Sequence, residues 1–219
     1  MDPVSVGFIA VLGGSAAIGG ARKLLERRRA RKALAARAPL GTETPEGTVV
    51  RVTGTVRVAD MKLVAPLSAV ECVVVRSRVG SMAGMAARAV RPKEWFAMVP
   101  FVLERAGEPP IAVEGEHALL DVEPQKLPRP HGPASPERAR RMQLLLKLGL
   151  KPTEVARATY EEVVVTAGMR VSVAGLMMLD PAAAPPPTTA ELGFRDLAPA
   201  SLRIAGNAEH PLVIGELVA

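Results

Sequence analysis

Side chains suited to catalysis or to metal binding are few and dispersed in this chain. The sequence has one cysteine, Cys72, and three histidines, His117, His131 and His210. A structural zinc site needs four cysteine or histidine ligands at short spacings, and an internal disulfide needs two cysteines, so neither is expected. The histidines are interpreted as surface residues, and Cys72, within an apolar stretch, as a buried and unreactive thiol.

The acidic residues predict no catalytic pair. Glu161 and Glu162 are adjacent in an apolar run, and because side chains alternate along a strand, we expect them on opposite faces. Asp121 and Glu123 can share a face, where solvated carboxylates are the ordinary interpretation. The chain also has no GxxxxGK[ST] phosphate loop, HExxH pair or GxSxG elbow. We therefore expect no enzymatic activity and no cofactor.

Positive charge is concentrated near the start of the chain. The net charge is +6, and residues 1–38 carry all of this excess, because the remainder is balanced. The cations of residues 22–32 are Arg22, Lys23, Arg27, Arg28, Arg29, Arg31 and Lys32. They predict a basic surface against anionic lipid headgroups, at about 1 kcal/mol for each cation near the membrane. The other interpretation, compatible with the first, is a topology signal with a solvated charged face. A nucleic-acid partner is not expected, since the rest of the chain is neutral.

An uncharged run from Pro3 to Ala21 precedes this basic cluster. At about 1.5 Å per residue, its length just spans a hydrocarbon core of about 30 Å. A signal peptide is the alternative, but such peptides begin with basic residues, and here the cations follow the run. We expect a transmembrane helix over residues 1–21 and a basic juxtamembrane helix and linker over residues 22–46. The positive-inside rule then places the N-terminus outside and the domain in the cytoplasm, which for a bacterial protein means the inner membrane.

Small residues recur four apart within the apolar run, as at Ala10 and Gly14. This spacing lets two membrane helices pack closely, so a homo-oligomer through this helix is one open expectation. The simpler interpretation, which we favour, is that the glycines only make the helix weakly hydrophobic.

The segment from Thr48 to Val79 has the pattern of two strands around a bend. Val50, Val52, Val56 and Val58 alternate with arginine and threonine, which predicts one buried face. Gly54 interrupts the run, where a bulge or a close backbone approach is expected. The spacing from Ser68 to Glu71 predicts one helical turn. Residues 70–79 predict a central strand.

The rest of the chain predicts mostly strands and one helix. The expected strands are Trp95–Glu104, Ile111–Val113, Ala118–Val122, Ala158–Val165, Met169–Leu179, Leu202–Ile204 and Leu212–Ile214. The strands on either side of Ala167-Gly168 are expected to form a hairpin. Ser135 and Pro136 predict a helix start, and Gly149 its end, with Arg138, Arg140 and Arg141 on the solvated side. The fold class is therefore mainly β, a barrel-like or sandwich-like domain over residues 47–219 with one inserted α-helix.

A series of short motifs carries a family resemblance. They are Gly54-Thr-Val, Leu63-Val-Ala-Pro-Leu-Ser68, Glu71-Cys-Val-Val-Val-Arg76, Phe101-Val-Leu-Glu-Arg-Ala-Gly107, Tyr160-Glu-Glu-Val-Val-Val and Ala167-Gly-Met-Arg-Val-Ser-Val-Ala-Gly175. In this order they resemble the GIDE domain, or beside-a-membrane (BAM) domain, of mitochondrial membrane-bound RING ubiquitin ligases and bacterial relatives. The resemblance implies the fold and a position beside a membrane. It does not extend to ligase activity, because a RING needs eight cysteine or histidine ligands.

Two functions fit these observations. The first is a non-catalytic, membrane-tethered module that recruits or senses a protein partner through strand edges and the loop from Gly80 to Pro92. Met82, Met85 and Trp95 are its candidate contact residues, although a variable surface loop is the ordinary interpretation of that segment. The alternative is an OB-type β-barrel that binds a small ligand or an oligonucleotide. The 3% aromatic content disfavours it, because bases stack on aromatic side chains.

Overall fold

The structure is a computed structural model that describes residues 24–41, 44–81, 93–127, 135–151, 158–179, 202–207 and 209–217. The predicted transmembrane helix over residues 1–21 lies outside these ranges, as do Arg22, Lys23, Met82, Met85 and His131.

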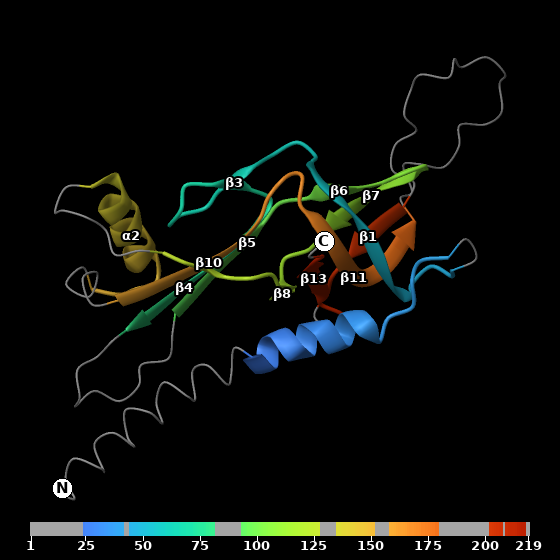
Figure 1. Cartoon of the computed structure of the whole chain (residues 1–219), viewed down its shortest axis with the longest axis horizontal. Helices are drawn as coiled ribbons and strands as arrows, with labels where there is room; N and C mark the ends of the chain where they lie inside the picture. Colours follow the sequence, from blue (N-terminus) through green and yellow to red (C-terminus); the bar gives the residue numbers. More distant parts are fainter. Residues whose placement is uncertain are drawn as a thin grey trace, which may run out of the picture.

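Five strands close into a barrel, at the right of Figure 1. They are β1 (Val49–Val58), β6 (Phe101–Arg105), β7 (Glu108–Glu114), β11 (Arg170–Leu179) and β12 (Leu202–Ala205). Their order is β1-β6-β7-β12-β11, and β1 also pairs with β11, which closes the ring. Two further strands, β13 (Leu212–Glu216) and β8 (Ala118–Asp121), continue the sheet from β11. The predicted β-rich, barrel-like domain with an inserted helix is confirmed.

The alternation predicted for the first strand is confirmed in β1. Val50, Val52 and Val56 are at most 3% exposed and belong to the main core. Gly54 lies where β1 passes from pairing with β11 to pairing with β6. A Cβ atom at Gly54 would stand 2.7 Å from the carbonyl oxygen of Glu104. The glycine is therefore required by a close backbone approach, one of the two predicted reasons.

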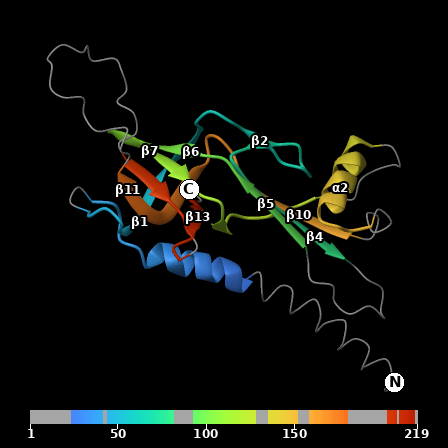
Figure 2. The same ribbon diagram turned by 180° about the vertical axis from the view of Figure 1, so that it is seen from behind.

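A second, four-stranded sheet projects from the barrel, with the order β5-β4-β10-β9. Its strands are β4 (Val74–Ser81), β5 (Lys93–Met98), β9 (Gln125–Lys126) and β10 (Ala158–Val165). They come from two insertions, one between β1 and β6 and one between β7 and β11. Helix α2 (Pro136–Lys147) covers this sheet, and the short hairpin of β2 (Leu63–Val64) and β3 (Glu71–Cys72) lies nearby (Figure 2). The predicted central position of β4 is confirmed.

Two strand predictions are wrong because the chain passes between the sheets where a single element was expected. The predicted strand Trp95–Glu104 is divided at Val99-Pro100 into β5 of the second sheet and β6 of the barrel. Similarly, β10 and β11 do not pair as a hairpin. β10 pairs with β4, and β11 pairs with β1, β12 and β13. Apolar residues continue through both crossings, so alternation alone does not reveal them.

Helix α2 begins as predicted, and its Ser135 Oγ accepts a hydrogen bond from the Arg138 backbone N–H at 3.2 Å. Leu144 and Leu145 are buried against Tyr160. The solvated position predicted for Arg141 is wrong, because its side chain is 2% exposed and its guanidinium lies 4.7 Å from the Tyr160 ring centroid. A cation over an aromatic face is stabilised there by the ring quadrupole.

The helical turn predicted from Ser68 to Glu71 is also wrong. Ala69 has a left-handed φ of 61°, and Glu71 already belongs to strand β3. The backbone N–H groups of Leu67 and Ser68 instead donate to the buried carboxylate of Glu162, at 3.1 Å and 2.8 Å. A side chain from β10 thus satisfies the Ser68 N–H, which a capping box would have paired with Glu71.

Candidate membrane-proximal site

A second helix, residues 24–35, lies along the barrel beneath β11 and β13 (Figure 1, blue). Its Ala30 and Leu34 are buried against Ala174 of β11 and Val213 of β13. Gly215 allows this close approach, because a Cβ there would lie 2.6 Å from Leu34 Cδ1. The basic segment is thereby joined to the folded domain through an apolar contact.

Asp121 at the end of β8 fixes this helix by charge. It accepts hydrogen bonds from Arg27 Nε at 3.1 Å and from Arg31 Nε at 2.7 Å. The two arginines are four residues apart and so lie on one helix face. The Asp121 side chain is only 9% exposed, which corrects the expectation of a solvated carboxylate. Such partly buried, charge-assisted bonds are stronger than exposed ion pairs.

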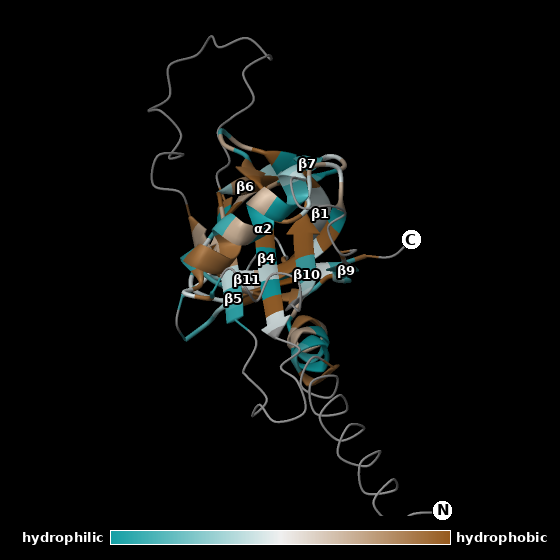
Figure 3. Ribbon diagram, turned by 90° about the vertical axis from the view of Figure 1, so that its left-hand side faces the viewer, coloured by the Kyte–Doolittle hydropathy of each residue, from teal (hydrophilic) through white to brown (hydrophobic). Residues whose placement is uncertain are grey.

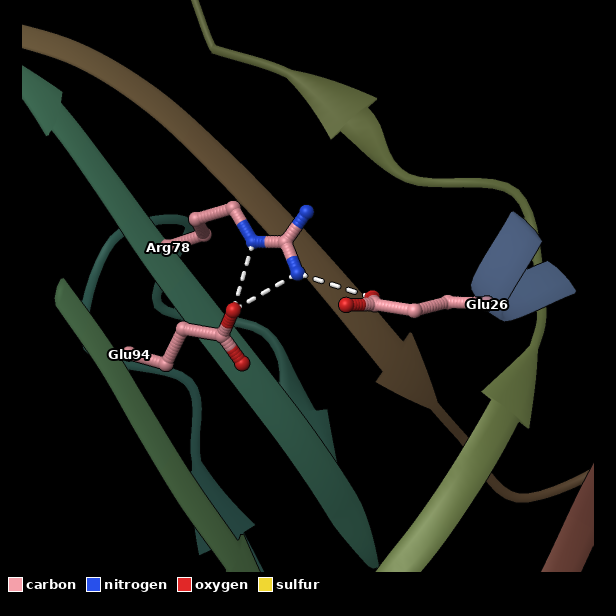
Figure 4. Close-up of polar contacts among 3 residues, drawn as sticks. All are labelled: Glu26, Arg78 and Glu94. Atoms are coloured by element: carbon pink, nitrogen blue, oxygen red, sulfur yellow. Dashed lines mark hydrogen bonds and ion pairs between the residues drawn. The ribbon is translucent and has the colours of Figure 1, made fainter. Parts of the chain in front are cut away.

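A further ion-pair chain joins the helix to the second sheet (Figure 4). Arg78 of β4 contacts Glu26 of the helix at 3.0 Å and Glu94 of β5 at 2.6 Å. Burial alone would lower the pKa of Arg78, but the carboxylates of Glu94 and Glu26 outweigh it and raise that pKa. The helix is therefore held by both sheets.

The opposite side of the helix is exposed and changes character along its length. Leu24 and Leu25, where the described part of the helix starts, are 61% and 54% exposed. Arg28, Arg29 and Lys32 follow them and are also exposed. Figure 3 shows hydrophilic and hydrophobic residues side by side on this helix. The exposed face is thus apolar at the end nearer the predicted membrane segment and basic beyond it.

The predicted basic residues therefore divide into two groups. Arg27 and Arg31 pair with Asp121, whereas Arg28, Arg29 and Lys32 are exposed and have no ion pair with the described residues. Asp121 and Glu26 anchor the helix, and no sequence pattern assigned them that role. A single acid within a basic run, as at Glu26, is the one signal that pointed to an internal partner.

Trp95 does not belong to a loop with Met82 and Met85. It is a half-buried residue of β5 that packs under helix α2, with Lys147 Nζ 5.8 Å from its ring centroid. With Val64, Pro66 and residues of α2, it lines a shallow groove. Of the three candidate contact residues, the one that the structure describes therefore lies on the second sheet.

The structure also places the other polar residues considered from the sequence, Glu161, Glu162 and His117. Glu162 is 1% exposed and Glu161 lies half-buried on the other face of β10, which confirms their predicted divergence. His117 is exposed, with its ring 6.1 Å from that of Phe96. Over the described ranges, no group of three or more His, Cys, Asp or Glu side chains is placed to hold a metal ion.

Neither helix of the described part of the chain combines the length and the apolar content needed to cross a membrane. Comparisons with protein-family models, with curated proteins and with solved structures gave no match.

Replacing Asp121 with Asn is expected to loosen the helix over residues 24–35 while the barrel remains folded. The amide keeps the size of the side chain but loses its charge, so both arginines lose a charge-assisted partner, at about 1.5–3 kcal/mol. Hydrogen exchange of the full-length protein should show faster exchange within residues 24–35 and little change in β10. Glu209→Gln, an exposed acid in the turn before β13, is the control. Unchanged protection of the helix in D121N would contradict the anchoring role.

Cys72 predicts a pH dependence of stability. The thiol is 2% exposed, and burial, with the nearby charge of Glu162, raises its pKa to about 11 from an ordinary value of 9.0. Above pH 9 the unfolded chain loses this proton while the folded chain retains it. Stability should therefore fall between about pH 9 and 11, by at most about 1.4 kcal/mol per pH unit from this group. Urea unfolding of Cys72→Ala should lack this component, and an identical pH slope in the variant would contradict it.

Proposed function

We propose that this chain is a membrane-anchored, non-catalytic module similar to the GIDE domain, with its β-rich domain at the cytoplasmic face of the membrane. The observation that carries the proposal is the exposed face of the helix over residues 24–35. It presents Leu24 and Leu25 first and then Arg28, Arg29 and Lys32. A membrane surface is apolar at depth and anionic at its headgroups, so it matches this order of side chains.

The contacts of the helix give the anchor a mechanical role. Ala30 and Leu34 pack on the barrel, and Asp121 and Arg78 hold the polar side of the helix. A membrane segment that leads into this helix would therefore set the orientation of the domain instead of tethering it by a free linker. The face presented to partners would be constant, which suits a recruiting or sensing module.

A second candidate is the OB-type binding barrel, and the closed five-stranded barrel is the observation that favours it. The surface of that barrel offers little for nucleic-acid bases. Phe101 is the only aromatic residue in its five strands, and it is fully buried. We therefore rank this function second. It predicts salt-dependent binding of a labelled single-stranded oligonucleotide, and full-length protein that does not bind one would eliminate the oligonucleotide form.

The test of the first proposal is fractionation of cells that produce the full chain with a C-terminal tag. We expect the protein to resist carbonate extraction and the tag to be protected from protease in sealed cells. Extraction into the soluble fraction, or a tag cleaved from outside, would overturn the anchor or its orientation.

A charge-reversed variant tests the basic face itself. Arg28→Glu, Arg29→Glu and Lys32→Glu together should increase the fraction of molecules with an accessible tag, because cations beside a membrane segment set its orientation. The matched control carries Arg140→Glu, Lys147→Glu and Arg170→Glu, which make the same charge change far from residues 24–35 in sequence. Equal topology in the two variants would mean that the exposed cations of the helix do not act at the membrane.

A further inference from the structure

A groove beside Trp95 lies between the β2–β3 hairpin and helix α2. It encloses about 230 Å³ and is lined on the hairpin side by Val64 and Pro66 and on the helix side by Arg140 and Lys147. Pockets for cofactors and drug-sized ligands usually enclose about 300–1,000 Å³. The groove is therefore of a size for one or two side chains of a peptide.

The apolar part of the groove is exposed. Val64 is 61% exposed, and the same hairpin exposes Met61 and Val70 at 62% and 37%. Three large apolar side chains on one short hairpin are an exposed cluster of the kind that marks protein contacts. Trp95 adds an indole face, which favours aliphatic and proline side chains as partners.

The charged residues that line the groove are all positive. Its lining contains two cations and no carboxylate. The two acids of the neighbouring strands are engaged elsewhere, since Glu94 pairs with Arg78 and Glu71 pairs with Lys62. Arg140 Nε is buried and has no hydrogen-bond acceptor among the described residues.

The groove is also preformed. Glu162 accepts hydrogen bonds from Leu67 N and Ser68 N at the tip of the hairpin and from Ser77 Oγ of β4, the last at 2.8 Å, and so joins the tip to the second sheet. Leu67 itself packs on Leu144 and Leu145 of α2 in one buried cluster. Because both walls are fixed before a ligand arrives, binding loses little free energy to ordering of the protein.

We infer that this groove binds a short acidic peptide segment of a partner protein. An aliphatic or proline side chain of the peptide lies on Trp95 between Val64 and Pro66, and flanking carboxylates pair with Arg140 and Lys147. The inference rests on the proposed binding role but not on the membrane anchor, so each can fail independently.

The test is a selection from a random peptide library on the full-length protein in detergent micelles. We expect enriched peptides to share at least two carboxylates around an aliphatic residue or proline. Trp95 is the only tryptophan of the chain, so an enriched peptide, resynthesised and titrated, should change its fluorescence. Failure of any peptide to be enriched, or enrichment of basic or uncharged peptides, would overturn the inference.

Charge reversal in the groove provides the second arm. Arg140→Glu with Lys147→Glu should weaken binding of the selected peptide at least tenfold, and a new selection should favour basic peptides. Arg37→Glu with Arg170→Glu, two exposed cations outside the groove, should leave binding within about twofold. Equal weakening by both pairs would mean non-specific attraction of the peptide. Binding of anionic vesicles by the groove in place of peptides would identify a lipid surface. Either result overturns the peptide site. A soluble full-length protein that still selects acidic peptides would reject only the anchor.

Discussion

Glu162→Gln is expected to lower the free energy of unfolding by about 3 kcal/mol. The carboxylate is 1% exposed and accepts hydrogen bonds from three donors, two backbone N–H groups and the Ser77 hydroxyl. An amide has only one acceptor oxygen, so its NH₂ group must face one of these donors. The loss of charge-assisted bonds and the buried donor left unpaired together account for the size of the effect.

Urea unfolding of the full chain, followed by Trp95 fluorescence, measures this change. Ser77→Ala removes one donor and should have a smaller effect of about 1 kcal/mol. The matched control is Glu71→Gln, because Glu71 forms an exposed pair with Lys62 at 2.7 Å, and such pairs contribute about 0–1 kcal/mol. An E162Q variant as stable as the E71Q variant would show that the carboxylate does not hold the hairpin.

Gly54→Ala is the second substitution with a large expected effect. It should lower the free energy of unfolding by at least about 2 kcal/mol. The added methyl group would lie 2.7 Å from the Glu104 carbonyl oxygen and 3.2 Å from Leu103 Cβ. Both atoms belong to β6, so relief requires the strands to separate and not a side chain to rotate. Overpacking within a closed core usually costs about 1–3 kcal/mol, and here it also weakens the pairing that closes the barrel.

Gly41→Ala is the control for this substitution. Its Cβ would meet only Thr44 Oγ1 at 3.6 Å, which is ordinary contact. Alanine also restricts the unfolded chain, so G41A should be neutral or slightly stabilising. Midpoints of urea unfolding compare the two variants, and a G54A variant as stable as G41A would contradict the close approach as the reason for the glycine.

Two elements that depend on a local sequence pattern agree with their predictions. The valine alternation of β1 and the Ser135-Pro136 start of α2 are local patterns, and both are confirmed. The division at Val99-Pro100 and the separation of β10 from β11 depend on which distant strand each segment meets. That choice is made by tertiary packing, so residue alternation does not contain it.

The basic helix face and the groove also depend on tertiary packing, which a local pattern does not predict. The sequence predicts a basic cluster, but its division into cations that pair with Asp121 and cations that face outward depends on how the helix packs on the barrel. The amphipathic pattern of α2 predicts a solvated Arg141, whereas the fold places its guanidinium over the face of Tyr160. Trp95 is predicted as part of a loop surface, whereas it lies in β5 beside a groove that exists only where the hairpin and α2 meet.

The construction of the second sheet from two insertions has a consequence for the order of folding. Val74 of β4 pairs with Val165 of β10, and Val49 of β1 pairs with Leu176 of β11. Neither partner exists until most of the chain has been synthesised, and pairings between distant segments form slowly. The residues before β1 leave the ribosome well before either sheet can close. If they insert as proposed, the domain completes its folding while already attached to the membrane, where its unpaired strands are confined near one surface and separated from the bulk cytoplasm.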